Sequence, residues 1–222
     1  MSPGAVDPRS TAFLGRWVLY CGAAELVGVA AGAAWWLAWD WVNPEPATLI
    51  AQVAMLGAKG LSGVVEGVIL GLVQSGLLRR LYPRLDRRAW IVATATMAVM
   101  GWLVGSSFAI LGVGGAEGSV TPDPGPLTTV LLAGSFGFAV GAVFGMAQSL
   151  VLRKVVGRGW IWVGANAAGW ALALPGIYLA ASADAGAATL LLAAASGVVA
   201  GLILGLVTGV ALRWMPARET TR

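Results

Sequence analysis

The sequence predicts an all-α, polytopic membrane protein with six transmembrane helices, built as three parallel hairpin repeats around a pseudo-threefold axis. Three observations favour this fold: an apolar composition, six long apolar runs, and a glycine pattern that occurs three times. Of the 222 residues, 58% are hydrophobic and 11% are charged, and the mean hydropathy is +0.82. Soluble domains carry about 25% charged residues, so lipid must be the solvent for much of this chain.

Each of the six runs is long enough to cross a bilayer core of about 30 Å, which takes about 20 helical residues. We expect the spans at residues 17–37, 49–78, 90–111, 127–152, 160–181 and 188–212. The segments between them hold charged residues, glycine and proline, which are typical of loops. The whole chain, 1–222, is then one membrane domain, with repeats at about 16–80, 89–154 and 159–214 and tails at 1–15 and 215–222.

The basic residues predict the orientation. All Lys and Arg residues except Lys59 lie before the first span, after the last one, or in the second and fourth loops. The charged residues of the opposite loops are all acidic, namely Asp40, Glu45, Glu117, Asp123 and Asp184. Because basic loops stay on the cytoplasmic side, we expect a protein of the cell inner (cytoplasmic) membrane with both termini in the cytoplasm.

Tryptophans prefer the two membrane interfaces, and most of those in this chain lie near the ends of the predicted spans. We expect an interfacial position at the basic ends for Trp17, Trp90, Trp160, Trp162 and Trp214. Trp102 and Trp170 lie deeper in their spans, so we interpret them as packing residues.

The repeat has the form G-x3-G-x3-G-x2-[Q/T]-x4-R in each even-numbered span. Its three copies are Gly63, Gly67, Gly71, Gln74 and Arg79; Gly137, Gly141, Gly145, Gln148 and Arg153; and Gly197, Gly201, Gly205, Thr208 and Arg213. Spacing by four places the glycines on one helix face, where backbones can approach closely. We expect the three even helices to pack through these faces near the axis, with the odd helices outside, and the arginines to anchor the topology.

In that arrangement Gln74, Gln148 and Thr208 meet one turn beyond the last glycines. They form either a hydrogen-bonded packing layer, the interpretation we favour, or a polar ring that constricts a pore.

Upstream of the glycine faces, each odd-numbered span begins after a basic cluster with a tryptophan and a β-branched residue: Trp17-Val18, Trp90-Ile91 and Trp160-Ile161. The glycine–glutamine–arginine segment followed by tryptophan resembles that of uncharacterised bacterial multi-pass membrane proteins. The resemblance covers most of the chain and implies an architecture, without an established activity.

Ionisable residues inside the membrane are costly and are candidates for function. Three occur, all in repeat 1: Glu25, Lys59 and Glu66. At 1.5 Å per residue, Glu25 lies about 14 Å and Glu66 about 20 Å from the basic interface, so antiparallel helices could bring the two carboxyls together to share a proton. With Gln52, these residues form a candidate polar site for an ion, proton or small solute. The alternative is that Lys59 extends to the outer interface while the glutamates stay protonated or bond to a neighbouring helix.

No catalytic or metal-binding pattern appears. The chain has no histidine, so the sequence Gly134-Ser135-Phe136-Gly137 lacks the usual base for a serine nucleophile. We expect no enzyme, no metal and no cofactor. The expected partners are the lipid bilayer and either other membrane subunits or further copies of the chain, and not nucleic acid. The sequence therefore predicts a non-catalytic helical module that stabilises or assembles a membrane complex; the alternative is a small channel or transporter that uses the charges of repeat 1.

Overall fold

A computed structural model of the chain describes residues 7, 10–42, 48–110, 125–183 and 188–218. These residues form the helices α1 (Thr11–Val42), α2 (Leu49–Gly60), α3 (Ser62–Leu81), α4 (Arg87–Ile110), α5 (Gly125–Leu152), α6 (Trp160–Ala181) and α7 (Thr189–Leu212). Six helical segments are long and apolar enough to cross a membrane, with α2 and α3 together forming one of them. The predicted all-α, multi-pass class is therefore confirmed for the described residues.

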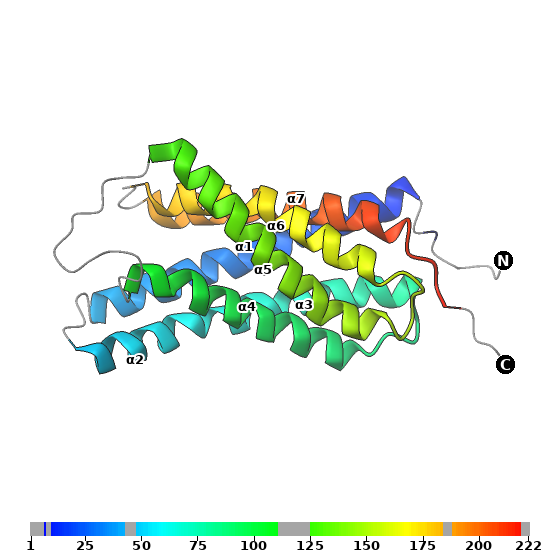
Figure 1. The fold of residues 1–222 in the computed structure, drawn as a ribbon, viewed down its shortest axis with the longest axis horizontal. Coiled ribbons are helices and arrows are strands. Elements are labelled where there is room, and N and C mark those ends of the chain that lie inside the picture. The colour runs from blue at the N-terminus through cyan, green and yellow to red at the C-terminus, as the bar shows by residue number, and fades with distance from the viewer. Residues whose placement is uncertain (1–6, 8–9, 43–47, 111–124, 184–187, 219–222) are drawn as a thin grey trace.

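The long helices run side by side along the bundle (Figure 1), and their contacts close into a ring. Going round the ring, α1 contacts α3, α3 contacts α4, α4 contacts α5, α5 contacts α6, α6 contacts α7, and α7 returns to α1. The short helix α2 packs against α4 and α1. Helix α1 begins and α7 ends at one end of the ring, where the connections 82–86 and 153–159 also lie. We call this end the basic end, because the arginines of those segments gather there.

The expected packing of the even helices on one another is wrong. Among the described residues, no Cα atom of α3, α5 or α7 lies within 8 Å of one in another of these three helices, so their backbones do not pack on one another. Instead, the glycine face of each of these helices packs against a helix of an odd-numbered span. Helix α3 packs against α4 (the third span), α5 against α6 (the fifth span), and α7 against α1 (the first span). The partner belongs in each case to the following predicted repeat, or for α7 to the first one, so the tightest contacts join neighbouring repeats.

The three glycine interfaces bring backbone onto backbone. A Cβ atom added at Gly67 would lie 2.4 Å from Cα of Ala95. One added at Gly141 would lie 2.5 Å from the carbonyl oxygen of Asn166, and one at Gly201 would lie 2.5 Å from that of Cys21. No real side chain tolerates such distances, so these positions need glycine for the observed helix separation. In lipid, this close packing replaces the hydrophobic drive between helices.

The prediction that all five tryptophans at the basic ends lie at the interface is wrong for three of them. Trp17, Trp90 and Trp162 are fully buried and pack as a cluster, with ring centroids 6.1 Å apart for Trp17 and Trp162 and 5.7 Å apart for Trp90 and Trp162. Trp160 and Trp214 are exposed, as expected. In the third repeat, the tryptophan of this cluster is thus Trp162, whereas the sequence pattern selects Trp160.

The second span, predicted for residues 49–78, lies at Leu49–Leu81, but a break that the sequence analysis did not predict divides it into two helices. It breaks at Leu61, between α2 and α3. The carbonyl oxygens freed by the break are bonded: that of Ala58 accepts from the indole of Trp35 at 2.7 Å, and that of Lys59 accepts from Trp36 at 3.3 Å and from the Ser62 hydroxyl at 2.7 Å. Backbone groups inside a bilayer need such partners, so α1 stabilises the break.

The basic end is closed by short connections that bond to one another. Val156 forms a β-bridge with Ala217, and the Tyr82 hydroxyl donates a 2.7 Å hydrogen bond to the carbonyl oxygen of Met215. Tyr82 is buried, and this burial raises its pKa from 10.0 to about 12. Asp86 caps α4 by accepting a 3.0 Å hydrogen bond from the backbone N–H of Ala89. The segments before α4, before α6 and after α7 are thereby fixed against one another.

Candidate functional site

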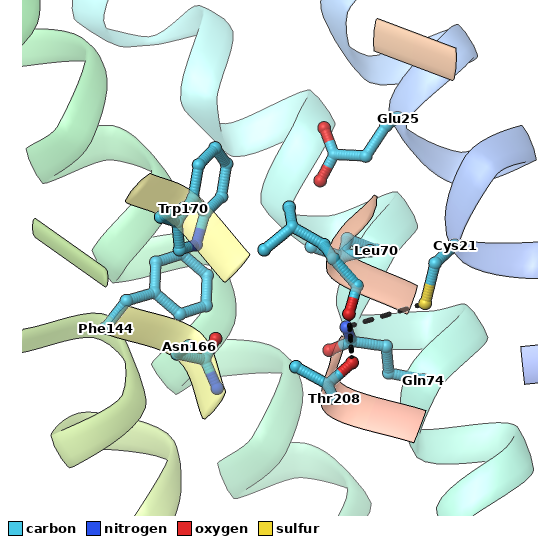
Figure 2. A pocket seen from close by; sticks show the side chains of 9 residues that line it. Cys21, Glu25, Leu70, Gln74, Phe144, Asn166, Trp170 and Thr208 are labelled. Atoms are coloured by element: carbon cyan, nitrogen blue, oxygen red, sulfur yellow. Dashed lines mark hydrogen bonds between the residues drawn. The ribbon is translucent and has the colours of Figure 1, made fainter. Parts of the chain in front are cut away.

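A small cavity lies at the centre of the ring and is lined by five helices (Figure 2). Its volume is about 10 Å³, close to the minimum that one water molecule needs. Its walls come from α1, α3, α5, α6 and α7, through Cys21, Glu25, Leu70, Gln74, Phe144, Asn166, Trp170, Leu204 and Thr208. The cavity is therefore enclosed by residues from all three predicted repeats.

The lining residues form two layers, which follow from the direction of each helix. Helices α1 and α6 begin at the basic end, whereas α3 and α7 finish there. The layer nearer the basic end is polar and consists of Cys21, Gln74, Asn166 and Thr208. One turn further from that end, Glu25 lies among Leu70, Trp170 and Leu204. The carboxyl group of Glu25 thus lies in the apolar layer, next to the polar one.

Polar side chains between the cavity and the tryptophan cluster form a connected network. Trp162 donates to Oε1 of Gln148 at 2.8 Å, and the amide nitrogen of Gln148 donates to Thr94 at 2.8 Å and to Oε1 of Gln74 at 3.4 Å. Trp17 donates to the Thr208 hydroxyl at 3.0 Å. The sequence-based expectation that Gln74 and Gln148 meet is confirmed, whereas Thr208 bonds to the first tryptophan instead of to the two glutamines.

The third glycine interface departs from this pairing. Trp17–Thr208 and Trp162–Gln148 each join a tryptophan to the polar residue of the glycine face packed on its helix. At the α3–α4 interface, Gln74 and Trp90 do not form this pair. The amide nitrogen of Gln74 lies 3.9 Å from Sγ of Cys21 on α1, and the indole N–H of Trp90 is buried without a partner in the described structure. Cys21 therefore takes part in the polar layer, a role that its position in an apolar run did not reveal.

Glu25 and Glu66 come together across the α1–α3 interface. A Cβ added at Gly28 would lie 3.0 Å from Cα of Glu66, so the two backbones are in close contact there. Gly28 lies three residues beyond Glu25 on α1, so Glu66 packs beside Glu25, and the two carboxyls would repel each other if both were ionised. Glu66 accepts a 2.6 Å hydrogen bond from the indole of Trp102 on α4. Neither carboxyl oxygen of Glu25 has a hydrogen-bond partner among the described residues, although the side chain is only 1% exposed.

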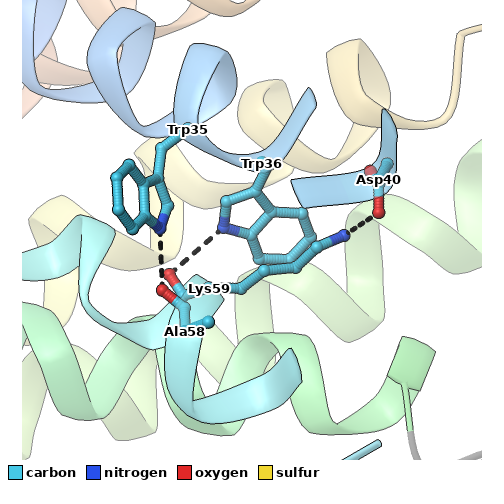
Figure 3. Close-up of polar contacts among 5 residues, drawn as sticks. All are labelled: Trp35, Trp36, Asp40, Ala58 and Lys59. Carbon is cyan, nitrogen blue, oxygen red and sulfur yellow. Dashed lines mark hydrogen bonds and ion pairs between the residues drawn. The ribbon is translucent and has the colours of Figure 1, made fainter. Parts of the chain in front are cut away.

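The side chain of Lys59 extends past Trp36 towards Asp40 (Figure 3). Its ammonium group forms an ion pair with Asp40 near the end of α1 and lies 4.4 Å from the ring centroid of Trp36. Trp36 packs in turn on Trp102, the partner of Glu66, with centroids 5.4 Å apart. Two indole rings thus lie between the lysine and the acidic pair. Asp40 follows the first span at the expected outer interface, towards which Lys59 could extend, so the ion pair could have been predicted from these two positions in the sequence.

The remaining predicted site residues lie apart from the cavity. Gln52 is half-buried on α2. Arg79 and Arg153 are exposed at the basic end and Arg213 is half-buried there, with a buried Nε that has no partner among the described groups. No cluster of three or more potential metal ligands occurs in the described part of the chain. Of the predicted acidic residues in the outer loops, Glu45, Glu117, Asp123 and Asp184 lie outside the described residues.

No protein-family model matches this sequence, and neither the curated proteins nor the solved structures give a match.

Proposed function

We propose that the protein is a non-catalytic membrane module that stabilises or assembles a larger membrane complex. The observation that carries this proposal is the closed interior of the helical ring. In the described part of the chain, the helices are joined by backbone contacts at three glycine interfaces, a buried tryptophan cluster and a polar network, and the central cavity between them has a volume of about 10 Å³. A rigid bundle of this kind presents constant outer surfaces to its surroundings.

Those outer surfaces are apolar, which favours partners inside the bilayer. Exposed side chains on the long helices include Leu19, Leu127, Leu131, Leu132, Phe138 and Leu191. The connection 82–86 and the connection 153–159 are short, so they offer little area to a soluble protein. The partner is accordingly another membrane protein or a further copy of this chain.

The proposal includes the predicted symmetry and orientation. Three packed helix pairs, α3–α4, α5–α6 and α7–α1, have the same glycine spacing and similar close backbone contacts, which supports a pseudo-threefold arrangement of three internal repeats. The basic end, with the arginines of the connections, faces the cytoplasm under the positive-inside rule. Single cysteines placed at Arg84 and at Thr48 in a Cys21→Ser background should react with a membrane-impermeant maleimide from opposite sides.

The decisive experiment is site-specific photo-crosslinking in the native membrane, with the photoreactive residue at exposed positions on each long helix. One protein crosslinked repeatedly from a single sector of the ring would support an assembly role, and placement at buried Leu152 or Leu212 provides the control. Crosslinks to lipid alone from every sector would contradict the proposal.

A transport role is tested separately in proteoliposomes. We expect no flux of protons, Na⁺ or K⁺ above that of empty liposomes, because the closed interior offers no continuous path. Flux that disappears in Glu25→Gln would overturn the proposed function and favour the transporter alternative.

A further inference from the structure

Glu25 is the one buried charged group of the described structure whose environment supplies no partner. The side chain is 1% exposed, points into the central cavity in Figure 2, and has two carboxyl oxygens without a hydrogen bond from any described residue. An ionised carboxylate in such a place is costly by many kcal/mol unless it is paired. Some positive group must therefore accompany it.

The protein itself does not provide this group. Among the polar residues that line the cavity, Asn166 donates to the carbonyl oxygen of Trp162 at 2.9 Å, Gln74 donates to Cys21, and the Thr208 hydroxyl donates to the carbonyl oxygen of Leu204. These bonds direct the donors of the polar layer away from Glu25. Lys59 is engaged with Asp40, and the other described basic residues lie at the basic end or in its connections.

The titratable groups that face Glu25 can be named for each packed helix. Cys21 comes from its own helix α1 and Glu66 comes from α3. The cavity residues of α5, α6 and α7 carry no titratable group. A second acidic residue beside Glu25, with no basic residue, increases the need for a positive charge.

We propose that Glu25, with Glu66 beside it, binds one small monovalent cation, a proton or Na⁺, in the central cavity. Glu25 supplies two free oxygens, and the cavity has room for about one water molecule or one dehydrated ion. Glu66 is held by Trp102 and is not among the residues that line the cavity, so the group that contacts the ion directly is the carboxyl of Glu25. The site does not depend on the proposed function, since a bound ion can serve structure in a module as well as coupling in a transporter.

Two measurements on purified protein in nanodiscs test the site. The first is the infrared band of a protonated, buried carboxyl, recorded as the difference between wild type and Glu25→Gln. The second is the thermal unfolding midpoint in NaCl compared with the same concentration of choline chloride. Glutamine has nearly the shape of a protonated glutamate, so Glu25→Gln is expected to fold.

A proton site gives a carboxyl band that is absent in Glu25→Gln, with equal midpoints in the two salts. A Na⁺ site gives a midpoint that rises with NaCl in wild type and not in Glu25→Gln, and a carboxyl band that NaCl diminishes. Asp40→Asn, which changes a carboxylate of α1 outside the cavity, should keep both signals. The absence of a Glu25-dependent band together with equal midpoints would overturn the proposal.

Discussion

The indole N–H of Trp162 donates a 2.8 Å hydrogen bond to Oε1 of Gln148 across the α5–α6 interface, and both side chains are fully buried. The same arrangement occurs at the α7–α1 interface, where Trp17 donates to Thr208 at 3.0 Å. At two of the three interfaces, the glycine face therefore contributes more than close packing: one turn beyond its last glycine, it places a polar acceptor against a tryptophan of the facing helix. The tryptophans and the acceptors together fix the register of the helix pairs.

We predict that Trp162→Phe destabilises the protein by about 1–2 kcal/mol, because it leaves the buried Oε1 of Gln148 without its donor. The measurement is reversible unfolding in mixed micelles. The control is Trp160→Phe, which changes an exposed ring and should have almost no effect. Equal stability of the two variants would show that this hydrogen bond does not hold the interface.

Gly67→Ala should destabilise the protein by about 1–3 kcal/mol through overpacking. The added Cβ would lie 2.4 Å from Cα of Ala95, so α3 and α4 must separate. Gly76 lies on the same helix with no atom within 4 Å of an added Cβ. Gly76→Ala is therefore the matched control, and its thermal midpoint should equal or exceed that of wild type, since alanine is the better helix former.

The ion pair of Lys59 and Asp40 is asymmetric, with side-chain exposures of 7% and 49%. Removing the exposed partner leaves a buried ammonium group, whereas removing the buried one leaves a carboxylate in contact with water. We therefore expect Asp40→Asn to destabilise more than Lys59→Met, by about 1 kcal/mol. Unfolding free energies of both variants and of the double variant measure this difference, and the reverse order would contradict it.

We predict that the folded protein loses stability at high pH because Tyr82 is buried. Its pKa is about 12 in the folded protein against 10.0 for the free side chain, so the folded state keeps the phenol proton more strongly. The resulting stabilisation is complete below pH 10 and is lost as the pH rises from 10 towards 12, with an upper limit of about 2–3 kcal/mol.

The control is Tyr82→Phe, which should be less stable at neutral pH because it loses the hydrogen bond to Met215, yet should show a shallower decline between these pH values. Parallel declines in wild type and variant would assign the pH dependence to other groups.

The apolar runs determined the helical class and the number of spans, because twenty consecutive apolar residues have few stable arrangements outside a membrane helix. The glycine spacing likewise identified the tight faces of α3, α5 and α7, and the sequence separation of Glu25 and Glu66 was sufficient to expect that the carboxyls approach each other. These inferences depend only on local composition and helical periodicity.

Only the tertiary structure decided which helix each glycine face meets, because a stripe of small residues fits any helix that can approach it. Nor does sequence reveal that Trp17, Trp90 and Trp162 turn inward: indoles suit an interface and a polar core equally well, and the choice depends on whether an acceptor such as Gln148 lies opposite. The same holds for Lys59 and Glu25. Each is a charge in an apolar run, yet three-dimensional packing gives the lysine a partner in Asp40 and leaves Glu25 facing the cavity without one.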